Sequence, residues 1–369
     1  MRVGLRFVSA TLILPAVLVG CVTISEACTG IRLKTRDGAI IYGRTMEFAD
    51  PLKSQVLVIP RGKEYVGIAP GNRPGLRWTV KYGIVGANAY GFDEIVDGIN
   101  EKGLVAAAFY HPDYAKYQTI RKEDESKTLA PWEFPTWLLS SFATVAEAKQ
   151  AASSVKVGAT TIPPALPITP PLHYILHDAT GACAVIEFTD GEMRIFDNPL
   201  GVITNAPTFD WHLTNLRNYV NLSPTNVPPV DVAGIKLGPL GQGSGWLGLP
   251  GDYTPPSRFI RAVAFSQGAE PAPTAEAGVN LAAHILNTFD IFAGAVRSKD
   301  PSIPFLEITQ WTVYADITNK CFYFKTYDDQ RISKVDLTKL DFGSGKVLSI
   351  PMGQKPTFDD VTAKGKPSK

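Results

Sequence analysis

The start of the folded chain is the feature that most constrains the fold, because a removable segment precedes the first strand signals. Two arginines among the first six residues are followed by an apolar run over residues 7–19, the length of a signal-peptide core. Pro15 interrupts this run, which is also too short to span a membrane. Ser25-Glu26-Ala27 places small residues where a signal peptidase needs them. We predict a signal peptide over residues 1–27, export, and a mature chain that begins at Cys28.

A second processing signal lies inside the same segment. Leu18-Val19-Gly20-Cys21 resembles a bacterial lipobox, in which the cysteine is lipidated and becomes the new N-terminus. Processing at Cys21 would leave seven residues ahead of Cys28 and yield a lipid-tethered protein anchored through Cys21. The two cleavages exclude each other unless a second cut follows, so both readings stay open. Beyond residue 27 no stretch approaches about 18 uninterrupted apolar residues, and we expect no membrane span.

Charge and hydropathy limit the class of partner. Hydrophobic residues make up 45% of the chain and charged residues 19%, as in a soluble globular protein with a substantial core. The formal net charge is +1, from 36 basic and 35 acidic residues without basic runs. This balance gives no electrostatic reason to expect nucleic-acid binding. The tail after Pro351 is polar and rich in lysine, and we expect it to fray.

Strand and hairpin signals dominate the chain, with separate helices between them. Asp37-Gly38 and Asp190-Gly191 each divide two apolar runs, which indicates tight hairpins. We predict further strands at Gln55–Ile59, Arg77–Ala87, Leu104–Tyr110, 173–178, 310–317 and 320–327. We predict helices after Pro131, after a capping box at Thr144 and Glu147, and at Trp211–Val220, Ser257–Ser266 and Ala275–Ala295. Few strands have βαβ spacing, so the pattern favours an α+β fold with antiparallel sheets.

Several common catalytic and binding patterns are missing from the sequence. Ser244 follows a glycine, but Gln242 and Trp246 stand where a nucleophile elbow needs glycines, and there is no H-E-x-x-H or phosphate-binding loop. No two cysteines show C-x-x-C spacing, and Cys183 and Cys321 are free to pair or to stay as buried thiols. The histidines form no cluster at ligand spacing: His111, His173, His177, His212 and His284. We therefore predict no metal site and no cofactor.

Cys28 carries the chemistry that remains. A thiol attacks only as thiolate, and its ordinary pKa of about 8.5 leaves little thiolate near neutrality. When Cys28 becomes N-terminal, its own α-amine, with an ordinary pKa of about 7.7–8.0, can accept the thiol proton. One residue then supplies both nucleophile and base, so no histidine is needed.

Four groups of residues resemble the choloylglycine hydrolase and penicillin V acylase family of N-terminal-nucleophile hydrolases. The first is the start of the mature chain: Cys28-Thr29-Gly30, Asp37-Gly38 and Gly43-Arg44-Thr45-Met46-Glu47. The others are DGINEKGL (Asp97–Leu104), TNAPTFDWHLTNLRNY (Thr204–Tyr219) and GLPGDYTPPSRFIRA (Gly248–Ala262). In order and spacing they cover most of residues 28–327.

The resemblance assigns roles at the start of the chain. Cys28 matches the nucleophile, and Arg44 matches an arginine that favours the thiolate by its opposite charge. Glu47 stands where many members have an aspartate that hydrogen-bonds the α-amine, so its carboxylate sits one methylene further out. Outside the family context Arg44 and Glu47 would be an ordinary surface ion pair.

It also assigns three residues further along the chain. Tyr110 matches a position that contributes to the oxyanion hole and is tyrosine in some penicillin acylases but asparagine in bile salt hydrolases. Asn205 matches the asparagine that provides a second oxyanion donor, and Arg258 matches the remaining arginine of the site. By themselves, Tyr110 reads equally as a core aromatic, Asn205 as part of a turn and Arg258 as a residue at a helix start.

The resemblance implies a fold and a reaction. It implies a four-layer αββα sandwich in a single domain over residues 28–350, followed by the tail at 351–369. It implies hydrolysis of a linear amide without a metal or cofactor, and commonly a homotetramer. Export and Tyr110 look most like the periplasmic acylases of Gram-negative bacteria, which accept penicillin V or N-acyl homoserine lactones, the quorum-sensing signals. Conjugated bile salts are the alternative substrates, and a non-catalytic binding protein is the alternative if Cys21 is processed.

Aromatic residues near the predicted site are candidates for lining the acyl pocket, although most of them are expected in the core. They are Phe48, Trp78, Phe109, Trp132, Trp137 and Trp246.

Overall fold

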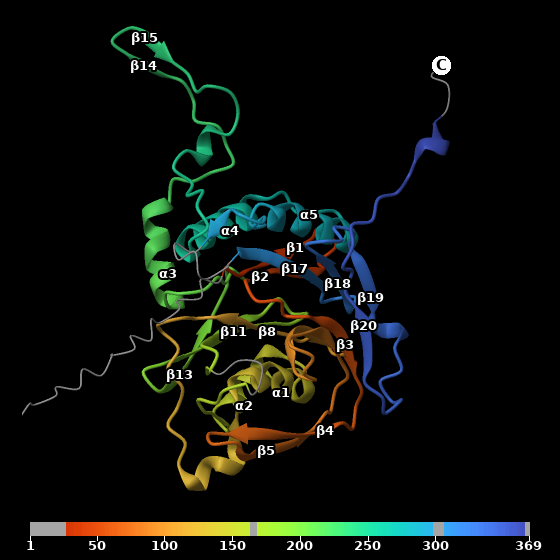
Figure 1. Cartoon of the computed structure of the whole chain (residues 1–369). Coiled ribbons are helices and arrows are strands. Elements are labelled where there is room, and N and C mark those ends of the chain that lie inside the picture. The colour runs from red at the N-terminus through yellow and green to blue at the C-terminus, as the bar shows by residue number, and fades with distance from the viewer. Residues whose placement is uncertain (1–26, 163–167, 298–305, 366–369) are drawn as a thin grey trace, which may run out of the picture.

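Two antiparallel sheets packed face to face form the centre of the protein in a computed structural model, which describes residues 27–162, 168–297 and 306–365 (Figure 1). The six-stranded sheet follows the order β1 (Thr29–Lys34), β2 (Ile40–Phe48), β17 (Leu306–Asp316), β18 (Cys321–Thr326) and β19 (Ser333–Asp336), with β16 (Val296–Arg297) also paired to β17. The eight-stranded sheet follows the order β13 (Glu192–Asp197), β12 (Cys183–Thr189), β11 (Leu172–His177), β8 (Val105–Tyr110), β7 (Ile95–Asn100), β6 (Ile84–Asn88), β3 (Gln55–Ile59) and β20 (Leu348–Pro351).

Helices cover the outer face of each sheet. The six-stranded sheet is covered by α4 (Pro255–Gly268) and α5 (Ala275–Asn287), and the eight-stranded sheet by α1 (Phe134–Ser141) and α2 (Val145–Ala152) (Figure 1). The resulting order of layers is helix, sheet, sheet, helix, which confirms the predicted four-layer αββα sandwich. Helix α3 (Phe209–Leu216) lies at one side of the sandwich (Figure 1).

Smaller elements decorate this body. Three two-stranded pairs are β4 (Glu64–Ala69) with β5 (Arg73–Thr79), β9 (Thr128–Leu129) with β10 (Lys156–Val157), and β14 (Val230–Val232) with β15 (Ile235–Leu237). Short 3-10 helices lie at Lys122–Lys127, Pro131–Glu133, Arg217–Tyr219, Ser244–Trp246, Leu337–Lys339 and Thr362–Lys364.

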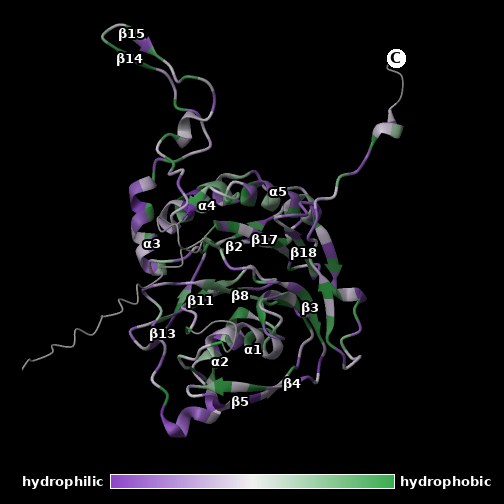
Figure 2. Cartoon of the chain, viewed as in Figure 1, coloured by the Kyte–Doolittle hydropathy of each residue, from purple (hydrophilic) through white to green (hydrophobic). Residues whose placement is uncertain are grey.

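Apolar side chains fill two of the interlayer spaces. One cluster, which includes Ile31, Phe109 and Val313, lies between the sheets, and a second, which includes Phe134 and Leu138, lies between the eight-stranded sheet and α1. Figure 2 shows the corresponding apolar colour along the strands and a hydrophilic 3-10 helix at residues 122–127. Because β8 is covered on both faces, every residue of its sequence VAAAFY is buried.

Several local predictions are confirmed. Gly38 takes a φ of 88° in the turn between β1 and β2, and Asp190 and Gly191 take φ values of 56° and 80° between β12 and β13. The Thr144 hydroxyl accepts a hydrogen bond from the Glu147 backbone N–H at 3.2 Å and so caps α2.

Two predicted elements are wrong in extent. The strand predicted at Arg77–Ala87 is divided into β5 and β6, because the backbone N–H groups of Lys81 and Tyr82 both donate to the Ser140 carbonyl and leave the ladder. The helix predicted at Ala275–Ala295 ends at Asn287, after which Ile291 exchanges hydrogen bonds with Thr309 of β17.

The remaining sequence expectations concern processing, cysteines and membranes. The predicted signal segment, including Cys21, lies outside the described residues except for its last residue, Ala27, which is buried. Cys183 in β12 and Cys321 in β18 are both free and buried. In the part of the chain that the structure describes, none of the helices combines the length and the apolar character that crossing a membrane requires.

Candidate active site

Cys28 lies at the edge of the space between the two sheets, directly before β1. Strand β1 pairs with β2 in a register that places Thr29 opposite Thr45 and Gly30 opposite Arg44. Side chains alternate along β2, so Arg44 and Met46 share one face of that strand. This face meets Cys28, whose side chain is buried.

Arg44 is the nearest cation to the thiol. Its Nη2 atom lies 3.0 Å from Cys28 Sγ. Burial raises the pKa of the Cys28 thiol, and the charge of Arg44 opposes that rise. The buried cysteine therefore rests as a thiol, and Arg44 makes its ionisation less costly than burial alone would.

Arg44 is itself held from several sides. Its guanidinium lies 4.3 Å from the centre of the Phe109 ring, and its Nη1 lies 3.7 Å from Asp97 Oδ2. The Tyr42 hydroxyl donates to the same Asp97 oxygen at 2.7 Å. Burial raises the pKa of Asp97 to about 7, with Arg44 acting in the opposite direction. Sequence reasoning gave Asp97 no role, although it opens the quoted motif Asp97–Leu104.

Asn205 holds the nitrogen of Cys28. The backbone N–H of Cys28 donates to Asn205 Oδ1 at 2.8 Å, and Arg258 Nη2 donates to the same oxygen at 2.7 Å. Two donors on one atom identify it as the amide oxygen, and Asn205 Nδ2 in turn donates to the Tyr110 carbonyl at 2.7 Å. Ala27 precedes Cys28 here, so removal of Ala27 would turn this peptide nitrogen into an amine at hydrogen-bond distance from Asn205.

Arg258 completes this arrangement from helix α4. Besides Asn205, its guanidinium donates to the Cys28 carbonyl and, at 2.9 Å, to the Thr29 hydroxyl. Burial lowers the pKa of Arg258, and the carboxyl of Glu47 opposes that effect. The helix-start position expected for Arg258 is correct, and it directs the side chain into the sheet edge.

Glu47 is held by two threonine hydroxyls. Its carboxyl oxygens accept hydrogen bonds from the hydroxyls of Thr309 at 2.8 Å and Thr45 at 3.1 Å, whereas the Cys28 nitrogen is bound by Asn205. Burial raises the pKa of Glu47 to about 8, and Arg258 opposes the rise. That Glu47 binds the α-amine stays a prediction for the processed chain.

An apolar cavity of about 100 Å³ opens beside Cys28. Its wall includes Met46, Phe48, Tyr90, Tyr110, Trp132 and Leu172. Two of the six candidate aromatics, Phe48 and Trp132, therefore line it. Among the others, Phe109 packs on Arg44, Trp78 and Trp137 stack on aromatic rings elsewhere in the fold, and Trp246 meets Phe265 edge to face.

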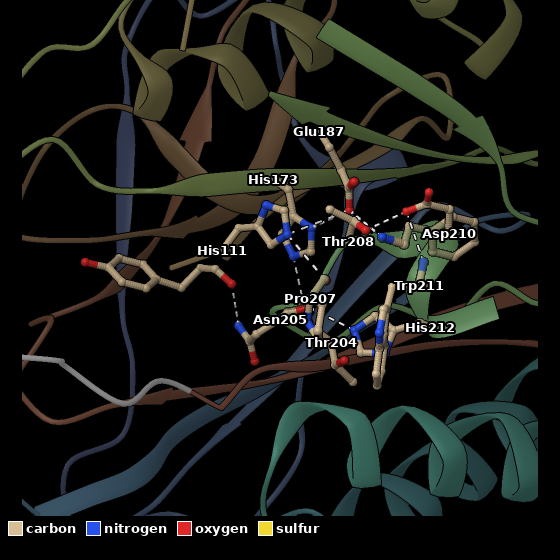
Figure 3. A network of polar contacts seen from close by, with 12 residues as sticks. His111, His173, Glu187, Thr204, Asn205, Pro207, Thr208, Asp210, Trp211 and His212 are labelled. Atoms are coloured by element: carbon tan, nitrogen blue, oxygen red, sulfur yellow. Dashed lines mark hydrogen bonds and ion pairs between the residues drawn. The ribbon is translucent and has the colours of Figure 1, made fainter. Parts of the chain in front are cut away.

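Three histidines gather behind Asn205, which sequence spacing did not predict (Figure 3). Two of them, His111 just after β8 and His173 on β11, lie beside Glu187 of the neighbouring strand β12. The possible metal-binding atoms of these three residues all lie within 4.8 Å of one another. Sequence spacing does not reveal this group, because the end of β8, strands β11 and β12 and helix α3 bring its members together.

This cluster does not fit a metal ion. The rings of His111 and His173 stack with their centres 4.3 Å apart and their planes only 4° from parallel. An imidazole binds a metal through a lone pair in the plane of its ring, and one ion cannot lie in two parallel planes. The Nε2 atoms of His111 and His173 are instead directed at backbone carbonyls.

Comparison with known proteins identifies a family and similar folds. The model of the linear amide C–N hydrolases, choloylglycine hydrolase family, matches residues 28–350. A bile salt hydrolase/transferase from Clostridium perfringens is 36% identical over 90% of this chain and 99% of its own. A crystal structure of a variant conjugated bile acid hydrolase from the same species, 30% identical, superimposes with a TM-score of 0.80 over 91% of this chain and all of its own. A penicillin V acylase from Pectobacterium atrosepticum is 28% identical over 85% of this chain and 81% of its own.

The contact between Arg44 and the Cys28 thiol can be tested by alkylation. Replacing Arg44 by Met removes the opposite charge beside the sulfur, so the pKa of the thiol rises and less thiolate is present at pH 7. We expect the rate of iodoacetamide modification of Cys28 at pH 7 to fall about 10-fold or more. Arg36→Met, at an exposed arginine, is the control. An unchanged rate in Arg44→Met would show that the guanidinium does not influence the thiol.

Proposed function

The chain belongs to the choloylglycine hydrolase family of linear amide C–N hydrolases, and from this premise we propose that it hydrolyses N-acyl amides with N-terminal Cys28 as nucleophile. The observation that carries the proposal is the separate binding of the two heteroatoms of Cys28. Asn205 holds its nitrogen and Arg44 holds its sulfur, beside an apolar cavity suited to an acyl group.

The proposed reaction begins with transfer of the Cys28 thiol proton to its α-amine. The thiolate, stabilised by Arg44, attacks the amide carbonyl and forms a tetrahedral oxyanion. We assign the stabilisation of this oxyanion to Asn205 and Tyr110. The donor from Asn205 is the side-chain N–H that does not bind the Tyr110 carbonyl. The α-ammonium then gives its proton to the leaving nitrogen, and the amine departs.

The acyl group remains on Cys28 as a thioester in this scheme. A water molecule attacks the thioester carbonyl and loses a proton to the α-amine, which gives a second tetrahedral intermediate. Its collapse releases the carboxylic acid and the Cys28 thiolate, and the α-ammonium returns the proton to the sulfur. One amide bond and one water are consumed, and one acid and one amine are formed. The site residues of the proposal are Cys28, Arg44, Glu47, Tyr110, Asn205 and Arg258.

We propose conjugated bile salts as the first substrates to test. The sequence motifs alone placed penicillin V and N-acyl homoserine lactones first, but the comparisons favour the alternative. The bile salt hydrolase/transferase of Clostridium perfringens is 36% identical and the penicillin V acylase of Pectobacterium atrosepticum only 28%. A specific observation keeps the acylase substrates as second candidates, because Tyr110 lines a narrow apolar cavity beside Cys28.

We also propose that the protein is exported to the periplasm and loses residues 1–27. Support comes from the apolar segment 7–19, the small residues before Cys28 and the need for a free amine on Cys28. The mass of the mature protein distinguishes an N-terminus at Cys28 from lipid attachment at Cys21. A lipid on Cys21 would favour a tethered binding protein instead.

A homotetramer is proposed on the same family basis and on one feature of the surface. The hairpin β14–β15 extends away from the body of the protein (Figure 1). It exposes the apolar side chains of Val230, Val232, Ile235 and Leu237, each more than half accessible. Exposed apolar residues on a protruding hairpin are typical of a contact between subunits, and we propose a second copy of this chain as its partner.

The catalytic proposal predicts the behaviour of Cys28→Ala on a panel of substrates. Release of free amine from a glycine- or taurine-conjugated bile salt, penicillin V and an N-acyl homoserine lactone should be measurable for the wild type on at least one of them. The variant should lose turnover on all three, because it lacks the nucleophile, and should keep the wild-type circular dichroism spectrum. Retained turnover in Cys28→Ala would rule out the proposed nucleophile, and the order of wild-type rates decides between the substrate classes.

The hairpin proposal predicts a change in assembly. Ile235→Asp combined with Leu237→Asp places two charges where apolar contacts between subunits are expected, so the mass from light scattering should fall from about four chains toward one. Lys236→Ala, between the two positions, is the matched control and should leave the mass unchanged. A monomeric wild type, or a double variant with the wild-type mass, would contradict the proposal.

A further inference from the structure

We propose that His111, His173 and His212 are positioning residues that hold the backbone of Thr204–Pro207, and through it Asn205, in the geometry that amide hydrolysis requires. The proposal rests on the proposed function, in which Asn205 binds the nitrogen of Cys28 and donates to the oxyanion. None of the three histidines is among the residues that line the cavity beside Cys28, so they act through Asn205.

Each histidine contacts a different carbonyl of this short loop (Figure 3). The Nε2 atom of His173 lies 3.0 Å from the Thr204 carbonyl oxygen. The Nε2 atom of His212 lies 3.1 Å from the carbonyl oxygen of Asn205 itself, and that of His111 lies 3.3 Å from the Pro207 carbonyl oxygen. Three of the four carbonyls between Thr204 and Pro207 are therefore bound by buried imidazoles.

These contacts fix a proton on Nε2 of each ring. A carbonyl oxygen only accepts hydrogen bonds, so every Nε2 must carry a proton. The Nδ1 atoms of His111 and His212 are buried and have no partner among the described residues. A proton on either atom would be a buried unsatisfied donor, so both rings are neutral. Burial also lowers the pKa of His111 and His173 to about 3 and that of His212 to about 4.

The opposite side of the loop is tied to the strand that follows the nucleophile. Gly30 of β1 and Ile203 exchange two backbone hydrogen bonds, at 2.8 and 3.1 Å. Asn205 thus directs its side chain at Cys28 and Arg258, and its own carbonyl at His212. A shift of the loop away from the histidines would move the Asn205 amide away from the Cys28 nitrogen.

Glu187 joins two parts of this arrangement. Its Oε1 accepts a hydrogen bond from the Phe209 backbone N–H at 2.9 Å and lies 3.4 Å from His173 Nδ1. Phe209 is the first residue of α3, the helix that carries His212. The ring of His212 also stacks on Phe259 of α4, with centres 4.5 Å apart. The donor to the Asn205 carbonyl is therefore fixed by contacts to two helices and to β12.

His212 offers the sharpest test because it binds Asn205 directly. His212→Phe keeps an aromatic ring against Phe259 but has no donor, whereas His212→Gln restores an amide N–H near the position of Nε2. We expect kcat to fall about 10-fold or more in His212→Phe and to recover most of that loss in His212→Gln, with KM nearly unchanged in both. His284→Phe, at an exposed histidine of α5, is the control for loss of a histidine.

Combination with Asn205→Ala distinguishes positioning from general stability. If His212 acts through the Asn205 side chain, adding His212→Phe to Asn205→Ala should cause no further fall in turnover. A second full loss in the double variant, full kcat in His212→Phe, or equal loss in the Phe and Gln variants would each overturn the proposal.

A measurement on the wild type separates this proposal from the proposed function. Nitrogen-15 spectra of the histidine side chains should show neutral rings protonated at Nε2 for His111 and His212 from pH 5 to pH 8. This result is expected whether or not any substrate of the panel is turned over. A neutral His212 ring protonated at Nδ1 would overturn the positioning proposal even if the enzyme is active. The measurement uses the wild type, so it does not depend on the folding of a variant.

Discussion

The pairing register of β1 with β2 is the constraint on which the whole site depends. It brings Thr29 opposite Thr45 and Gly30 opposite Arg44, and so places the guanidinium against the sulfur of the residue that precedes β1. A slip of one residue would turn Arg44 and Met46 toward the helical layer and Thr45 toward the cavity. Such a slip is opposed on the other edge of β2, where β17 pairs along nearly its whole length.

Burial and the charges of nearby arginines shift the pKa values of the acidic groups in this site in opposite directions, and the balance explains the chemistry of the site. Burial raises the pKa of the Cys28 thiol and of the Asp97 and Glu47 carboxyls, and the buried guanidinium groups of Arg44 and Arg258 counteract it. Arginines keep their charge where lysine or histidine would lose it, so they suit this site. A resting thiol then needs a nearby base, and a free amine on Cys28 would supply one without another residue.

Sequence reasoning succeeded where residues of the site are close in the chain or lie in recognisable motifs. The structure brings Cys28, Arg44, Asn205 and Arg258 together. All four could be identified from the sequence because each lies in one of the quoted motifs. Asp97 and His212 also lie in quoted motifs, but their roles were missed, like those of His111 and His173, because their contacts depend on strands and a helix far apart in sequence. The strand predicted at Arg77–Ala87 was too long because two hydrogen bonds to the Ser140 carbonyl, and not local composition, end the ladder.

The central claim is that one residue supplies both nucleophile and base, and the turnover of two purified forms tests it most directly. One form has Cys28 as its first residue and the other retains Ala27 ahead of it, with both N-termini verified by intact mass. We predict turnover for the first form only, because a peptide nitrogen at Cys28 cannot accept the thiol proton. Equal turnover by the form that retains Ala27 would contradict the account.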